Sequence, residues 1–397
     1  MIFLIDKNEF YSYEELLNEI NNSTNYYPYL QTESLYDFWI NFIKAIAAGK
    51  EITLIDSDII DIIQKEKSKK NVKISLHFNC LSELINACFN SHSLITIFTS
   101  GTTGQPKKIE HNIKNLARSV RTGEKYANQI WGFAYNPTHM AGIQVFLQAF
   151  ANLNPLINIF NQPREGIYKV IEEYGITHIS ATPTFYRLLM PFEKEFTNVQ
   201  RITFGGEKSD ENLYEHIRRI FPNAKINNIY ASTEAGFLFV SKGENFIIPE
   251  NIRDKIKIID NELLVHYSLL GSSDNLKLDN EYYQTGDLIE WVNYEKGEFK
   301  FKSRKNELIN IGGYKVNPNE VEEALEKMTE IKQAIVYGKK NSVLGNVLCA
   351  DVVLNKPITE IDIRKNLSKI LQDFKIPRRI RFIDEIELTR TGKIKRI

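Results

Sequence analysis

A loop in which hydroxyl residues alternate with glycines is the part of the sequence best suited to phosphate chemistry. The string TSGTTGQPK follows the apolar run 94–98. A glycine-rich turn leaving a strand presents backbone N–H groups and hydroxyls to anionic oxygens, and a lysine adds a positive charge. The predicted polyphosphate-binding residues are Thr99, Ser100, Gly101, Thr102, Thr103, Gly104 and Lys107.

The spacing of this loop differs from that of the Walker A loop, which needs four residues between its glycines and a Gly-Lys-Ser/Thr ending. Here two residues separate Gly101 from Gly104, and Gln105 and Pro106 precede the lysine. At every position the string instead resembles the phosphate loop of the AMP-forming adenylating enzymes. This superfamily includes acyl-CoA synthetases, the adenylation domains of peptide synthetases, and luciferases.

A histidine segment follows in the order that this family would have. Residues 136–142, NPTHMAG, are similar to the Pro-Leu-x-His-x-x-Gly segment of acyl- and aryl-CoA ligases. The resemblance implies that His139 lies beside the acyl pocket and the path of the thiol; a hydrogen-bonded structural histidine is the alternative. Peptide-synthetase domains usually carry an aspartate in this region to hold a substrate amine. Residues 133–140 contain none, which argues against an α-amino acid substrate.

Two further motifs resemble the nucleotide-binding segments of the family. Gly205, Gly206 and Glu207 match a Gly-Gly-Glu segment that lies beside the adenosine, and residues 228–234, NIYASTE, match Asn-x-Tyr-Gly-x-Thr-Glu. Ala231 replaces the usual glycine, and its methyl group either trims the acyl pocket or shifts the local backbone.

The residue types of the second motif suit the roles that the resemblance implies. The amide of Asn228 can read the adenine amino edge, and the ring of Tyr230 can stack on the purine. The hydroxyl of Thr233 can bond the α-phosphate, and the carboxylate of Glu234 is a hard oxygen ligand for Mg²⁺.

The C-terminal third carries the remaining motifs of the family. Asp287 ends a Tyr-x-Thr-Gly-Asp match, and Arg304 matches the arginine that also holds the ribose. Gly312 and Gly313 resemble the glycine loop that lines the thiol channel in relatives. Lys393, in a Thr-x-x-Gly-Lys-x-x-Arg ending, is the expected adenylation lysine; a solvated basic tail is the alternative.

Composition excludes several other classes of function. Fifty basic residues balance fifty acidic ones over 397 residues, so net charge gives no argument for a nucleic acid or an anionic membrane as partner. The three cysteines lack metal-ligand spacing and are expected to be reduced core thiols. The start MIFLIDKNEF does not resemble a signal peptide, and no apolar run reaches transmembrane length. We therefore expect a cytoplasmic protein.

The apolar periodicity predicts an α/β protein with two domains. Short apolar runs alternate with helical patterns, which indicates a mostly parallel sheet covered on both faces. The predicted strands are 94–99, 156–160, 178–181, 201–204 and 226–230, and the predicted helices are 112–128, 164–174, 184–191 and 210–220. A small β subdomain is expected over 237–302.

We predict a large N-terminal domain of layered α/β sheets, residues 1–304 and reduced at its start, and a small mobile α+β cap domain, residues 305–397. Asn306 stands at the family's hinge position. The implied activity is adenylation of a carboxylic acid with ATP and Mg²⁺, then transfer to the thiol of coenzyme A. A stand-alone ligase that loads a carrier protein's phosphopantetheine is the alternative, and a silent nucleotide-binding module is a third. The sequence leaves open which acid is used, the pathway and the oligomeric state.

Overall fold

The structure is a computed structural model, and it divides into two compact units. The first contains residues 1–256 and 265–283, and the second contains 257–264 and 284–397. The residues that the structure describes are 1–31, 34–56, 71–99, 107–190, 194–207, 209, 211–243, 245–274, 276, 278–305, 307–311, 314–341 and 345–387.

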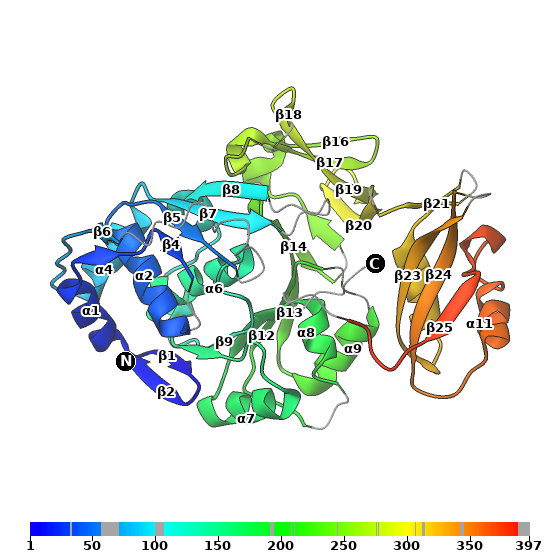
Figure 1. Cartoon of the computed structure of the whole chain (residues 1–397), viewed down its shortest axis with the longest axis horizontal. Helices are drawn as coiled ribbons and strands as arrows, with labels where there is room; N and C mark the ends of the chain where they lie inside the picture. The colour runs from blue at the N-terminus through cyan, green and yellow to red at the C-terminus, as the bar shows by residue number, and fades with distance from the viewer. Residues whose placement is uncertain are drawn as a thin grey trace. The chain divides into compact units, whose positions relative to one another are not determined.

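A large, mostly parallel sheet forms the framework of the first unit (Figure 1). Six strands lie side by side in the order β1, β10, β9, β11, β12 and β13, and all their pairings are parallel. At the two ends of this parallel series, β2 pairs antiparallel with β1 and β14 pairs antiparallel with β13. The strands are β1 (Ile2–Asp6), β2 (Glu9–Ser12), β9 (Trp131–Phe133), β10 (Leu156–Asn158), β11 (His178–Ala181), β12 (Arg201–Gly205), β13 (Lys225–Ser232), β14 (Gly236–Lys242) and β15 (Asn245–Ile247). The parallel sheet expected from the sequence is confirmed.

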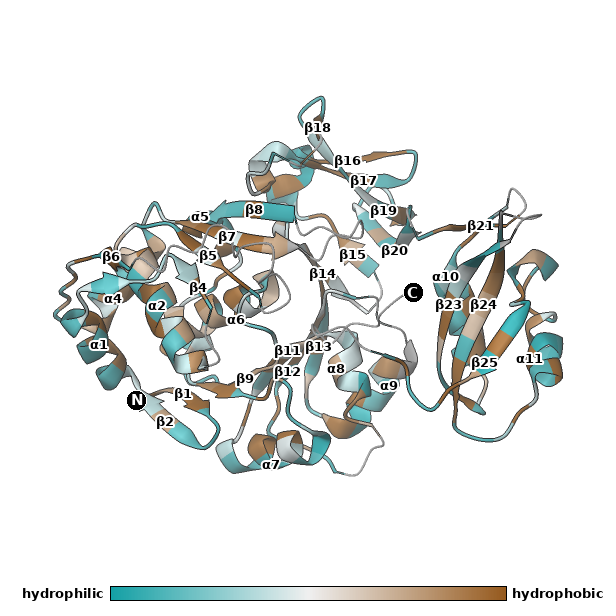
Figure 2. Cartoon of the chain, viewed as in Figure 1, coloured by the Kyte–Doolittle hydropathy of each residue, from teal (hydrophilic) through white to brown (hydrophobic). Residues whose placement is uncertain are grey.

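Helices cover both faces of this sheet. Neighbouring residues of a strand point to opposite faces, so one strand contributes side chains to two apolar cores. Leu4 of β1 packs in a core with α2 (Leu35–Ala47) and α6 (Met140–Ala151), while Ile5 packs in a second core with α7 (Arg164–Tyr174) and α9 (Glu211–Ile220). Most of β1 is accordingly hydrophobic in Figure 2.

A smaller sheet in the same unit holds the ends of the predicted phosphate loop. Its strand order is β4 (Tyr29–Leu30), β5 (Ile52–Leu54), β7 (Leu94–Thr99) and β8 (Lys107–Asn112). β7 and β8 pair antiparallel, with Thr99 opposite Lys107. Nearby, α1 (Tyr13–Asn22) begins at a capping box formed by Ser12 and Glu15. α4 (Leu81–Phe89) follows β6 (Val72–Lys73), which pairs with β3 (Asn25–Tyr26).

Two predicted helices are shorter in the structure. The helix expected over 112–128 is a single turn, α5 (Ile113–Leu116), followed later by a 3₁₀ turn at Glu124–Tyr126. Gly123, with φ of +117°, lies outside helical geometry, and the side chain of Arg118 donates to the carbonyls of Ala235 and Phe237, far away in sequence. The helix expected over 184–191 is α8 (Pro183–Arg187).

The predicted β subdomain is present, and most of its strands belong to the second unit. Its order is β16 (Ile256–Ile259), β17 (Glu262–His266), β19 (Tyr282–Asn293) and β20 (Glu298–Arg304), with β18 (Leu278–Asp279) beside β19.

The C-terminal part of the second unit is an α+β structure with its own apolar core. β23 (Ile331–Asn341) and β24 (Gly345–Leu354) are antiparallel, and β25 (Arg379–Phe382) is parallel to β24. The core also includes α10 (Pro318–Glu326) and α11 (Glu360–Leu367), and the hairpin of β21 (Ile309–Ile311) and β22 (Tyr314–Val316) precedes them. Pro318 starts α10 after the N-cap Asn317, where its fixed φ suits the first helical position. The domain boundary at 304/305 stays a prediction, and Asn306 lies outside the described residues.

Two observations bear on the class of protein expected from composition. Over the described residues, none of the helices has the length and apolar character needed to cross a bilayer. Cys88 and Cys349 are buried free thiols, as expected, but Cys80 is exposed and is not a core thiol.

Candidate active site

The predicted site residues of the first unit lie where its strands end. The carboxyl ends of neighbouring parallel strands meet at one edge of a sheet, which is where open α/β sheets bind their ligands. β9 leads to His139, β12 ends at Gly205 and leads to Glu207, and β13 leads to Thr233 and Glu234. The parallel order of β9, β11, β12 and β13 therefore brings three separate sequence motifs to the same edge (Figure 1).

The phosphate loop is closed at its base by the β7–β8 pairing of Thr99 with Lys107. The side chain of Lys107 is partly buried. The loop residues Ser100, Gly101, Thr102, Thr103 and Gly104 lie outside the described residues, as do Gly312, Gly313 and Lys393. Their predicted roles stay predictions.

Glu207 is a fixed carboxylate. Its Oε2 accepts hydrogen bonds from the backbone N–H of Thr184, at 3.0 Å, and from the Thr184 hydroxyl, at 2.7 Å. Gly206 has φ of +81°, which favours glycine. A Cβ on Gly205 would lie 3.3 Å from the hydroxyl of the buried Tyr135. The Gly-Gly-Glu segment thus makes a tight turn that joins the ends of β11 and β12.

The adenine-reading residues proposed on β13 are held by their neighbours. Asn228 is buried, and its Nδ2 donates to the hydroxyl of Ser209 at 3.0 Å. Tyr230 is partly exposed and stacks on Phe239 of β14, with ring centroids 5.6 Å apart. The β13–β14 register shifts between Tyr230 and Ala231. This irregularity re-aims the strand where the motif begins to turn.

The Thr233–Glu234 turn presents oxygen ligands that other side chains do not occupy. Both side chains are partly exposed, and within the described part of the chain neither makes a side-chain hydrogen bond or ion pair. The backbone is fixed, because the Thr233 carbonyl is 2.7 Å from Nε2 of His111, and the Glu234 carbonyl accepts from the N–H of Gly271 at 2.7 Å.

This donor set fits a magnesium ion that is bound mainly through a substrate. No group of three or more acidic, histidine or cysteine side chains able to hold a metal occurs among the described residues. Mg²⁺ is usually held by one or two carboxylates together with substrate phosphates rather than by an all-protein cage. Glu234, a partly exposed carboxylate with no partner among the residues that the structure describes, suits that arrangement.

Sequence reasoning missed an aspartate beside His139. Oδ2 of Asp56, at the end of β5, is 2.9 Å from Nε2 of His139 and accepts from Nδ2 of Asn136 at 3.2 Å. The Asp56 side chain is 8% exposed and that of His139 is 29% exposed. The histidine is therefore both hydrogen-bonded and partly open to solvent. An aspartate directly after the strand-like run ITLI, residues 52–55, was the available signal.

This aspartate also weakens one argument made from the sequence. The absence of an aspartate in residues 133–140 argued against an amine-bearing acid, yet the carboxylate of Asp56 lies against that segment. Oδ2 of Asp56 is already bonded to His139 and Asn136, so the structure does not favour an amine-bearing acid. Amino acids should nevertheless be included among the acids that are tested.

Asp287 and Arg304, expected to hold a ribose, contact each other in the second unit. Arg304 Nε donates to Oδ1 of the buried Asp287 at 2.7 Å, and the two residues are direct partners in the β19–β20 register. Arginine in this position fixes the carboxylate and neutralises its charge.

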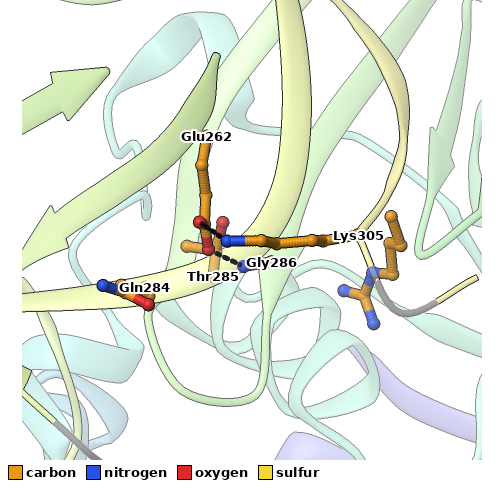
Figure 3. Close-up of a pocket in the computed structure, with 6 residues that line it drawn as sticks. Glu262, Gln284, Thr285, Gly286 and Lys305 are labelled. Atoms are coloured by element: carbon orange, nitrogen blue, oxygen red, sulfur yellow. Dashed lines mark hydrogen bonds and ion pairs between the residues drawn. The ribbon is translucent and has the colours of Figure 1, made fainter. Parts of the chain in front are cut away.

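A second missed residue, Glu262, shapes the turn that leads to Asp287 (Figure 3). Its Oε1 accepts from the N–H of Gly286 at 2.9 Å, and its Oε2 pairs with Nζ of Lys305 at 3.0 Å. A cavity of about 320 Å³ is lined here by Glu262, Gln284, Thr285, Gly286, Arg304 and Lys305. The cavity offers polar groups of both charges.

Comparison with known proteins agrees with this picture of an α/β nucleotide-binding enzyme. The AMP-binding enzyme family matches residues 43–258, and the C-terminal domain of AMP-binding enzymes matches residues 320–393. The chain belongs to the AMP-binding enzyme family.

Two curated relatives are similar over most of this chain. Gramicidin S synthase 2 of Brevibacillus brevis is 25% identical over 341 residues, which cover 76% of this chain but 8% of that protein. The chain thus spans a small part of that relative. The 2-succinylbenzoate–CoA ligase of Staphylococcus aureus (strain JH9) is 27% identical over 381 residues, covering 88% of this chain and 75% of that protein.

The fold is that of a solved CoA synthetase. The o-succinylbenzoate CoA synthetase of Bacillus subtilis, in complex with its acyl-adenylate intermediate, has a TM-score of 0.69 at 18% identity and covers 99% of this chain and 94% of that one. Its complex with ATP and magnesium gives a TM-score of 0.70 at 20% identity, covering 99% and 95%. This likeness confirms the mixed α/β fold with a large N-terminal and a small C-terminal domain.

Proposed function

We propose that the protein is an AMP-forming acid–thiol ligase that activates a carboxylic acid with ATP and then transfers the acyl group to coenzyme A. The observation that carries the proposal is the shared sheet edge of the first unit. There a fixed carboxylate, a histidine–aspartate pair and a turn with free oxygen ligands follow neighbouring parallel strands.

In the first half-reaction, a carboxylate oxygen of the acid attacks the α-phosphorus of ATP, and pyrophosphate leaves with the electrons of the broken P–O bond. Both reactants are anions, so catalysis depends on positioning and on charge neutralisation. Lys107 and Lys393 would supply positive charge, and Thr233 would donate its hydroxyl to an α-phosphate oxygen. Mg²⁺ bound at Glu234 would offset the charge of the leaving pyrophosphate.

We assign roles in adenosine binding to residues of each unit separately, following the family resemblance. Asn228 and Tyr230 would contact the adenine, with Gly205, Gly206 and Glu207 beside the adenosine. Asp287 would accept hydrogen bonds from the ribose hydroxyls, and its contact with Arg304 orients the carboxylate for that task.

The second half-reaction forms a thioester when a thiol displaces AMP. The family resemblance suggests that the C-terminal domain rotates about Asn306, which withdraws Lys393 and presents Gly312 and Gly313 to the thiol. Asn306→Pro restricts the backbone and should slow thioester formation more than pyrophosphate release. Unchanged thioester turnover in this variant would count against the hinge.

An aromatic surface of the second unit favours coenzyme A over a carrier protein. Tyr314, which is 59% exposed, stacks on Phe374 with ring centroids 4.5 Å apart, beside a cavity of about 200 Å³ that Arg378 also lines. Both acceptors carry the phosphopantetheine arm, but only coenzyme A adds a purine and a 3′-phosphate. Aromatic rings bind the former by stacking, and arginine binds the latter.

The choice of acceptor can be measured directly. Tyr314→Ala should raise the KM for coenzyme A roughly tenfold, because stacking on one base contributes on the order of 1–3 kcal/mol. The KM for pantetheine should not change. Ile361→Ala, at another exposed apolar side chain of the same unit, serves as the control. Acyl transfer to a holo carrier protein but not to coenzyme A would favour the alternative.

The adenylation half-reaction is tested by ATP–pyrophosphate exchange with aryl, aliphatic and amino acids. Exchange should depend on one class of acid and on Lys393, and Lys393→Ala should lower its rate by about 10²–10³. The same variant should still transfer the acyl group from a supplied acyl-adenylate. An equal loss in both half-reactions would refute the role of Lys393. The absence of exchange with every acid tested would refute the proposed activity on aryl, aliphatic and amino acids.

A further inference from the structure

The segment that directly follows the phosphate loop holds the Thr233–Glu234 turn by its backbone. Nε2 of His111, on β8, is 2.7 Å from the Thr233 carbonyl. Arg118, just after α5, donates to the carbonyls of Ala235 and Phe237 at 2.6 and 2.8 Å. None of these contacts uses a side chain of the motif, so the side chains of Thr233 and Glu234 remain available for a ligand.

His111 is a neutral donor at this position. The residue is 1% exposed, and a carbonyl can only accept, so Nε2 carries the proton. Nδ1 is buried and has no hydrogen-bond partner among the described residues. Burial, together with the nearby charge of Arg118, lowers the pKa of His111 to about 4, although the contact with the Thr233 carbonyl acts in the opposite direction. A second proton on Nδ1 would have no acceptor, which keeps the donor tautomer fixed.

Arg118 is a partly buried cation whose partners are all carbonyls. Besides Ala235 and Phe237 it contacts the carbonyl of Leu269 at 3.3 Å, and within the described part of the chain no carboxylate pairs with it. Burial lowers the pKa of its guanidinium. Removing a charge from water without a counterion is unfavourable, and the bonds to the three carbonyls offset that cost.

Gly271 completes the arrangement because it allows a close approach that no other residue would permit. Its N–H donates to the Glu234 carbonyl at 2.7 Å. A Cβ added there would lie 2.6 Å from Cε1 and 2.7 Å from Nε2 of His111, shorter than any ordinary contact. The imidazole therefore fills the space against the backbone of residue 271.

We infer that His111 and Arg118 are positioning residues that set Thr233 and Glu234 for the metal–ATP complex. The identity of that ligand rests on the proposed function. The phosphate loop and the Thr233–Glu234 turn come from distant parts of the chain. β8 begins where the phosphate loop ends, and its His111 contacts the backbone of the turn. The orientation of the Glu234 carboxylate then depends on groups that never contact substrate.

The test compares three variants by their binding of Mn²⁺ in the presence of a non-hydrolysable ATP analogue, followed by electron paramagnetic resonance. His111→Leu should weaken Mn²⁺ binding about tenfold, the equivalent of one hydrogen bond. His111→Gln keeps an N–H donor near the position of Nε2 and should restore binding to within about threefold. Gly271→Ala pushes the imidazole away and should resemble His111→Leu.

His178→Leu is the matched control, because His178 is also a buried histidine but begins β11 at the opposite end of the strand from the site. It should lower stability without weakening Mn²⁺ binding. If His111→Leu binds Mn²⁺ as the wild type does, or if His111→Gln fails to restore binding, the inference is overturned.

Failure of the proposed function is recognised separately. A wild-type protein that binds Mn²⁺ with the analogue but exchanges no acid overturns the ligase proposal and leaves the positioning result standing. A wild-type protein that binds no Mn²⁺ with the analogue overturns both.

Discussion

Asp56 is the residue whose loss should most clearly separate binding of the acid from binding of ATP. It contacts His139 and Asn136 through one carboxylate oxygen, and it belongs to none of the motifs of the family. Asp56→Asn removes the charge and keeps the shape, whereas Asp56→Ala removes the acceptor from both donors. The pair of variants therefore separates orientation by hydrogen bonding from stabilisation by charge.

The size of the effect follows from the burial of the two donors. Asn136 is buried, so losing its acceptor costs about 1–3 kcal/mol, whereas His139 is partly exposed and water can replace part of its bond. We expect Asp56→Ala to lose about 2 kcal/mol of transition-state stabilisation, or roughly thirtyfold in kcat/KM for the acid. Asp56→Asn still accepts one bond and should lose about fivefold.

The assay is ATP–pyrophosphate exchange measured against acid concentration and, separately, against ATP concentration. The acid dependence should change and the KM for ATP should stay within twofold. Glu165→Ala, which removes an exposed carboxylate paired with Arg164, is the control and should change neither. If Asp56 acts through His139, the double variant with His139→Ala should be little worse than His139→Ala alone. Fully additive effects, or a change confined to ATP, would refute the reasoning.

Two further predictions concern stability. Burial lowers the pKa of His178 to about 4, helped by the charge of Arg201, so between pH 6.5 and 4 the unfolded chain binds a proton that the folded chain does not. The contribution of His178 to the free energy of unfolding should therefore fall on acidification by about 2 kcal/mol from pH 7 to 5, and urea titrations should show a shallower pH dependence in His178→Gln than in the wild type. Gly142→Ala should lower the free energy of unfolding by about 1–3 kcal/mol, because its Cβ would lie 2.5 Å from the Asn136 carbonyl oxygen. Gly166→Ala, in the first turn of another helix, meets only a side chain at 3.3 Å and should be neutral or stabilising in the same titrations, and equal losses in both variants would contradict the clash.

The sequence predicted best those elements that local chemistry determines. The strand 178–181 and the helix 164–174 occur with the predicted bounds, because an apolar run and an amphipathic pattern each end at a clear turn signal, such as Gly175. The capping box of α1 is a signal of the same local kind, because Ser12 and Glu15 have the spacing that such a box requires.

Two predictions failed for different reasons. The helix over 112–128 was predicted too long: it ends after one turn, and Gly123, with φ of +117°, lies outside helical geometry within that range. Asp56 was missed for a non-local reason, since its partner His139 is 83 positions distant and neither residue marks the other in sequence.

The described site residues show a division of labour that the motifs alone do not reveal. Each motif supplies a group suited to contact substrate, and a residue outside the motif fixes it: Thr184 holds Glu207, Asp56 holds His139, Glu262 holds the turn before Asp287, and His111 holds the turn before Glu234.

Preorganised groups assist a reaction because they need no rearrangement when charge develops. The supporting residues should therefore affect kcat and metal binding more than overall folding. Their identities can differ between relatives that keep the same motifs, because any donor or acceptor of the right reach can perform the same task.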